Sequence, residues 1–177
     1  MEREVRYCTT EDGVRIAYCA EGKGPTTILA LPAMIETFSL DHLMSVYKQF
    51  YVDLGAGRRV IRFDWRGTGL SRHIPDGAPV EDAAADVAAV ALAAGKPCAV
   101  WASTIAGPTA VQFALARPEL VSHLILYGTY AAVSDAIPQA IRDGLGSLAR
   151  ADWRMAAQTI ADMNGRREHP RGRGATG

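Results

Sequence analysis

The sequence has 177 residues, of which 49% are hydrophobic and 21% charged, and 19 basic side chains balance 19 acidic ones. This length allows one buried core and argues against two full domains. Zero net charge argues against nucleic acid or an anionic membrane as the main partner, because both attract a basic excess. The longest purely apolar run, 87–94, is far shorter than the ~20 residues of a membrane helix, and the N-terminus lacks an apolar signal-peptide core. We therefore expect a cytoplasmic protein with no membrane partner.

The N-terminal segments 5–9 and 14–18 alternate in polarity around Asp12-Gly13, which predicts a β-hairpin. With a two-residue turn, Cys8 would face Ala17 rather than Cys19. The three cysteines are widely spaced and form no C-x-x-C pair, so they indicate neither a zinc site nor a disulfide framework. We expect buried or half-buried free thiols at Cys8, Cys19 and Cys98, with no bound metal or cofactor.

Four apolar runs then predict strands buried on both faces of a sheet, at residues 27–31, 59–64, 98–102 and 124–127. Helical periods separate them. The first helix follows Ser39 as a plausible N-cap and ends before Gly55, the second has Pro79 near its start, and the third runs to about Ala116. Strands that alternate with helices predict an α/β fold with a mainly parallel twisted sheet, flanking helices and right-handed crossovers.

The C-terminal part changes character twice. Residues 134–164 have the pattern of two amphipathic helices, with Asp152 as the cap of the second helix. Residues 165–177 contain Gly, Arg and other small or polar residues that cannot bury a core, which predicts a disordered basic tail. The predicted organisation is therefore a core at 1–133, lid-like helices at 134–164 and the tail.

Two motifs carry a resemblance to a known family. Asp64-x-Arg66-Gly67-x-Gly69-x-Ser71 directly after a predicted strand resembles the signature loop of α/β-hydrolases, and 117–121 resembles the stretch after that family's nucleophile helix. The segments 61–71 and 126–128 look similar to hydrolase-like domains attached to bacterial regulators or nucleotide cyclases. The resemblance implies an incomplete α/β-hydrolase fold with the start of a helical lid. In the family the signature loop is architecture, so we expect no catalytic role for it.

The resemblance implies a sharp strand-to-helix turn with the pattern small-x-nucleophile-x-small. Ala102-Ser103-Thr104-Ile105-Ala106 fits that pattern and places Thr104 at the nucleophile position. The competing register, with Ser103 at that position, would flank the turn with two large side chains, Trp101 and Ile105. The resemblance further implies an oxyanion hole formed by the backbone N–H groups of Ile105 and of the loop near Met34.

Thr104 is an unfavourable occupant, because a β-branched residue resists the left-handed backbone that such a turn requires. The turn must therefore either keep its strain or relax and lose the exposed hydroxyl. Its hydroxyl can also serve as a turn-stabilising or half-buried group. The segments that carry the family's acid and histidine are absent, and His42, His73, His123 and His169 do not occupy the expected place.

Three functions stay open at this point. The leading prediction is a catalytically impaired α/β-hydrolase relative, either a shortened gene product or a non-catalytic family member. The alternatives are an active hydrolase of small ester or amide substrates, and a ligand-sensing or interaction module of a regulator. The predicted strand 124–127 has no later strand to pair with, which predicts self-association, and a small-molecule ligand is the other expected partner.

Overall fold

The computed structural model describes residues 4–33, 37–38, 45–75, 82–132 and 137–165. The chain divides between Val133 and Ser134 into two units. The first unit contains one six-stranded sheet in the order β1-β2-β4-β3-β5-β6. Its strands are β1 (Val5–Thr9), β2 (Arg15–Glu21), β3 (Thr27–Ala30), β4 (Arg59–Phe63), β5 (Cys98–Ser103) and β6 (Val121–Tyr127). Strands β4, β3, β5 and β6 are parallel to one another, which confirms the predicted α/β fold with a mainly parallel sheet.

The N-terminal hairpin is present, but its predicted register is wrong by one residue. Cys8 pairs with Ile16 rather than with Ala17. The connection is a three-residue loop closed by Thr10, whose hydroxyl accepts from the Val14 N–H at 2.8 Å, and it ends with Gly13 at φ 85°. A glycine in this left-handed conformation is typical of three-residue hairpin loops, and the extra residue shifts every pair along the ladder. The cysteines are free thiols, two of them buried and Cys8 half-buried, as predicted.

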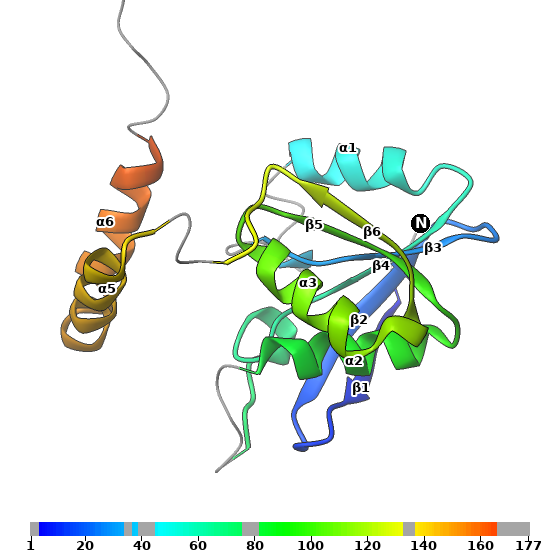
Figure 1. The fold of residues 1–177 in the computed structure, drawn as a ribbon, viewed down its shortest axis with the longest axis horizontal. Helices are drawn as coiled ribbons and strands as arrows, with labels where there is room; N and C mark the ends of the chain where they lie inside the picture. The colour runs from blue at the N-terminus through cyan, green and yellow to red at the C-terminus, as the bar shows by residue number, and fades with distance from the viewer. Residues whose placement is uncertain (1–3, 34–36, 39–44, 76–81, 133–136, 166–177) are drawn as a thin grey trace, which may run out of the picture. The chain divides into compact units, whose positions relative to one another are not determined.

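Helices cover both faces of the sheet (Figure 1). Helix α1 (Ser45–Leu54) lies over one face, while α2 (Ala83–Ala94) and α3 (Gly107–Ala116) lie over the other. The chain passes from β3 to β4 on one side and then crosses β3 to reach β5 on the other. The direction of winding therefore reverses between β3 and β5, and in such sheets this point opens a crevice beyond the carboxyl ends of the strands.

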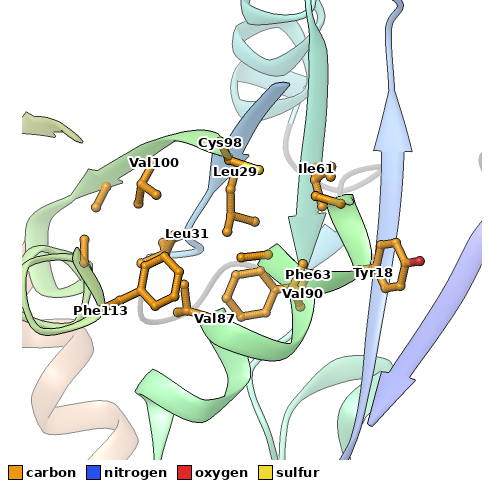
Figure 2. Close-up of a cluster of buried hydrophobic side chains, with 14 of the residues drawn as sticks. Tyr18, Leu29, Leu31, Ile61, Phe63, Val87, Val90, Cys98, Val100 and Phe113 are labelled. Carbon is orange, nitrogen blue, oxygen red and sulfur yellow. The ribbon is translucent and has the colours of Figure 1, made fainter. Parts of the chain in front are cut away.

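The main core lies between the sheet and the helix pair α2 and α3. Figure 2 shows side chains of the sheet and of the covering helices meeting in one cluster. Its largest fully buried members are Phe63 and Phe113, and it also contains Leu29, Ile61, Val87, Val90 and Val100. A second cluster on the other face joins Tyr51 of α1 to Ile28, Ala30, Val60 and Ala99 of the sheet. Burial of these side chains at about 25 cal/mol per Å² of apolar area stabilises the sheet between its two helical layers.

The structure shows how α2 begins. The side chain of Asp82 accepts from the Ala85 N–H at 3.1 Å, so Asp82 is the N-cap of this helix. The predicted start residues Ser39 and Pro79 lie outside the described residues, so these two helix starts stay predictions. The helix ends agree with the sequence, because Gly55 follows α1 and Gly95, at φ 77°, follows α2.

Strand β6 begins at Val121, earlier than predicted, and pairs only with β5 among the described residues. Its apolar side chains from Leu124 onward are exposed, from 38% at Leu124 to 72% at Tyr127. An apolar edge of this kind can pair with another chain, so self-association stays a prediction.

The second unit contains the helices α5 (Gln139–Ala151) and α6 (Trp153–Gly165), which pack against each other. Asp152 joins them. Its N–H donates to the Leu148 carbonyl at 2.7 Å, and its carboxylate accepts from the Met155 N–H at 3.0 Å, which confirms the predicted cap. The predicted tail beyond residue 165 lies outside the described residues. Across the described part of the chain, no helix is long and apolar enough to cross a membrane.

Candidate active site

A sharp turn connects β5 to α3 at the carboxyl edge of the sheet. Strand β5 ends at Ser103, a short 3-10 helix spans Thr104–Ala106, and α3 begins at Gly107. Ala102 and Ala106 flank the turn and are 0% and 3% exposed, both within the main core. Larger side chains at these two places would have to displace core neighbours, so the small residues of the sequence pattern have a packing reason.

Thr104 lies at the apex of this turn with φ 49°. Of the described residues other than glycine, it alone has a positive φ. Its side chain is exposed, and its hydroxyl makes no hydrogen bond to any residue that the structure describes. Of the two expected outcomes for a threonine here, the structure shows the strained turn with an exposed hydroxyl. Such a conformation costs on the order of 1–3 kcal/mol and is typical of functional sites.

The competing register, with Ser103 at the nucleophile position, is not the one that the structure shows. Ser103 has φ −128° and ψ 160°, so it is an extended residue at the end of β5 with a half-buried side chain. Ile105 is half-buried in the first turn of the 3-10 helix, where N–H groups have no acceptor within the helix. The backbone N–H predicted as an oxyanion donor therefore belongs to the turn that carries Thr104.

The second predicted oxyanion residue, Met34, lies outside the described residues. The chain leading to it is held beside β5, because the Leu31 N–H donates to the Trp101 carbonyl at 2.9 Å. The Trp65 indole then donates to the Pro32 carbonyl at 3.0 Å. These bonds place the end of β3 next to the strand that leads to Thr104, at the point where the winding of the sheet reverses.

Neither of the described histidines makes a hydrogen bond to the turn. His123 lies on β6 with its Nδ1 3.3 Å from the Ser122 hydroxyl, and His73 makes no hydrogen bond to Thr104. His42 and His169 lie outside the described residues. Burial raises the pKa of the half-buried Cys8 thiol to about 11, so this thiol is mostly protonated near neutral pH. In the described ranges, no group of three or more His, Cys, Asp or Glu residues is placed to hold a metal ion.

The loop from Asp64 to Ser71 uses its polar groups within the protein. The buried Asp64 carboxylate accepts from the Phe38 N–H at 3.0 Å and from the Leu70 N–H at 2.9 Å. The Ser71 hydroxyl donates to the Asp64 carbonyl and accepts from the Ala17 N–H, both at 2.8 Å. Gly69 has φ 47°, and a Cβ there would collide with the Asp64 carboxylate. These contacts support the architectural role that the sequence analysis assigns to this loop.

Arg66 of the same loop holds two acidic residues that sequence reasoning missed. Its Nε donates to Asp86 at 2.8 Å, and its Nη1 donates to Asp12 at 2.7 Å. The backbone N–H of Arg66 also donates to Asp86, at 3.0 Å. The Asp86 side chain is 0% exposed. Burial raises the pKa of Asp86, and the hydrogen bonds from Arg66 act in the opposite direction. The network ties the hairpin turn to α2.

Sequence reasoning also missed Thr129, which follows the end of β6. Its hydroxyl donates to the carbonyl oxygen of Thr104. A Cβ on Gly107 would collide with the Thr129 side chain, so only glycine fits that place without a shift. The available signals were Gly107 itself, directly after the turn pattern, and a hydroxyl residue at the end of the neighbouring parallel strand.

Comparison with known proteins supports this architecture. The chain matches the family model described as alpha/beta hydrolase fold over residues 28–155. No curated protein sequence matches the chain.

Three solved structures illustrate the likeness. An esterase from Exiguobacterium antarcticum has a TM-score of 0.70 and 20% identity, and an alpha/beta hydrolase from Sphaerobacter thermophilus has 0.69 and 25%. Each match covers 90% of this chain and 60% of the other. An epoxide hydrolase from an endophytic Streptomyces has a TM-score of 0.52 and 28% identity, over 70% of this chain and 36% of the other. The chain therefore spans 36% to 60% of the lengths of these three proteins.

Proposed function

The chain belongs to the alpha/beta hydrolase fold family, and we propose that its Thr104 turn is a ligand site with impaired capacity to hydrolyse esters. The expected ligand is a small carbonyl compound of the kind that acyl-transfer sites accept. One observation carries the proposal: Thr104 presents an exposed hydroxyl at φ 49°, and no described residue is placed to take its proton. The narrower resemblance to regulator-linked domains stays a prediction.

The impairment follows from the chemistry of acyl transfer. Hydrolysis through a covalent intermediate needs an activated nucleophile, a base that removes its proton, and donors where the oxyanion forms. Thr104 supplies an alcohol with no hydrogen-bonded base among the described residues, and the familiar activation of threonine by its own N-terminal amine is impossible at an internal residue. Binding and oxyanion donors alone give only the residual rate that remains when a catalytic triad loses its members.

A second candidate is an active hydrolase of small esters. The retained left-handed turn favours it, because strain of this kind persists where a site depends on it. The fold is also that of an esterase, at an identity that supports the fold alone. On this reading, a base outside the described residues would reach the Thr104 hydroxyl.

A paired rate measurement separates the two candidates. The full chain and its Thr104→Ala variant are compared for hydrolysis of p-nitrophenyl acetate at equal concentration. A serine-reactive fluorophosphonate probe gives a second readout. We expect equal rates and no labelling, and we expect Thr104→Ser to leave the rate unchanged because the base is still missing. Turnover that disappears in Thr104→Ala, with labelling of Thr104, would overturn the proposal and establish the active hydrolase.

A further inference from the structure

The carbonyl oxygen of Thr104 accepts two hydrogen bonds. The first comes from the Gly107 N–H and closes the 3-10 turn. The second comes from the Thr129 hydroxyl, which belongs to the segment after β6 rather than to the turn. Ser103 pairs with Tyr127 in the sheet, so β5 and β6 end side by side and bring Thr129 to the apex of the turn. A residue far along the chain therefore holds the peptide group that follows Thr104.

This contact has a geometric consequence for Ile105. The peptide bond between Thr104 and Ile105 is trans, so its C=O and N–H point in opposite directions. Two donors on the oxygen fix the rotation of the peptide plane, and the Ile105 N–H must then point away from Thr129. Acceptance of hydrogen bonds at the oxygen also polarises the N–H of the same peptide, which makes it a stronger donor.

We infer that Thr129 is a positioning residue for the oxyanion site, because its hydroxyl orients and polarises the Ile105 N–H through the Thr104 carbonyl. The inference rests on the proposed ligand site at Thr104. Thr129 contacts neither ligand nor reacting atoms and acts through the backbone. A preoriented donor stabilises developing negative charge without reorganisation, which is the main contribution of an oxyanion hole.

Gly107 supports the inference independently. Its backbone is helical, with φ −59° and ψ −49°, so no left-handed conformation requires glycine there. A Cβ at residue 107 would meet the hydroxyl, the methyl and the Cβ of Thr129. The absence of a side chain on Gly107 thus admits Thr129 to the Thr104 carbonyl, and the two residues act as a pair.

The test uses amide spectra of the ¹⁵N-labelled full chain in three forms: unchanged, Thr129→Val and Thr129→Ser. Valine keeps the shape of threonine without the hydroxyl, and serine keeps the hydroxyl. We expect the Ile105 amide nitrogen to shift in Thr129→Val and to stay in place in Thr129→Ser. An unshifted Ile105 resonance in Thr129→Val would overturn the inference. So would equal shifts in both variants, which would indicate a packing effect.

A second pair of variants tests the contact from the other side. Gly107→Ala alone should lower the melting temperature, although alanine is the better helix former. The double variant Gly107→Ala, Thr129→Gly should recover much of that loss, because every Thr129 side-chain atom that the new Cβ would meet is removed. A Gly107→Ala protein that melts higher than the unchanged chain would contradict the pairing. Neither readout depends on turnover, so failure of this inference and failure of the proposed function are separate results.

Discussion

Two loops at the carboxyl edge of the sheet use their polar groups in opposite ways. The loop after β4 directs its polar side chains inward: Asp64 and Ser71 satisfy backbone groups, and Arg66 holds Asp12 and Asp86. The turn after β5 points the hydroxyl of Thr104 outward, with no acceptor or donor among the described residues. The number of polar residues in a loop therefore does not identify a ligand site. The loop with more of them uses them in hydrogen bonds and ion pairs within the protein.

The two loops also differ in backbone strain. The loop after β4 reaches its tight turns with Gly67 and Gly69, which adopt positive φ at little cost. The turn after β5 places a β-branched residue in that region, where it is disfavoured. The first loop therefore uses its polar groups within the fold, whereas the second exposes one hydroxyl on a strained backbone. Three substitutions test this contrast, from the largest expected effect to the smallest.

Asp86→Ala should have the largest effect. The change removes the buried acceptor of the Arg66 Nε–H and of the Arg66 backbone N–H, and breaking one side of a buried ion pair costs about 3–5 kcal/mol of unfolding free energy. Urea unfolding followed by circular dichroism measures the loss. A change below about 1 kcal/mol, the value of an exposed pair, would show that the network does not stabilise the loop.

Thr104→Gly should have the opposite sign. Glycine removes the left-handed penalty of roughly 1–2 kcal/mol but adds backbone freedom to the unfolded chain, so we expect a net gain of about 0.5–1 kcal/mol. The matched control is Thr104→Ala, which keeps a Cβ at positive φ and should gain nothing comparable. The same unfolding assay applies. A loss of stability in Thr104→Gly would mean that the threonine side chain holds the turn together.

Asp12→Asn should have the smallest effect, and mainly at neutral pH, where the Asp12 carboxylate is ionised. The hydrogen bond from Arg66, followed by that from Thr10, lowers the pKa of Asp12 below its ordinary value of 3.8. The unfolded chain therefore takes up this proton at higher pH than the folded one, and the contribution is lost as the pH falls below 3.8. It should amount to less than about 1 kcal/mol, because the site is partly exposed. Unfolding at pH 7 and pH 3 should show a shallower acid loss in the variant, and an identical loss would contradict the assignment.

Local sequence signals predicted the strands, the parallel sheet and the place of Thr104. Apolar runs and small flanking residues are patterns that lie within a few consecutive positions of the chain. The hairpin register was wrong because Thr10 bonds to Val14 and lengthens the loop, which the Asp12-Gly13 signal does not reveal. Partners distant in sequence escaped prediction. Asp86 and Thr129 reach their loops only once strands and helices are assembled, so no periodicity marks them.

The place of β4 between β2 and β3 affects how the sheet assembles. The β1–β2 hairpin needs only local contacts, but β2 and β3 follow each other in the chain without becoming neighbours. Both of these strands have β4 as a neighbour, and β4 comes after α1 in the chain. Non-local pairing of this kind slows folding, because loop closure must precede any gain from the contacts. During synthesis the hairpin therefore leaves the ribosome with one edge open. The pairing of β4 with both β2 and β3 is therefore what joins the hairpin to the parallel part of the sheet.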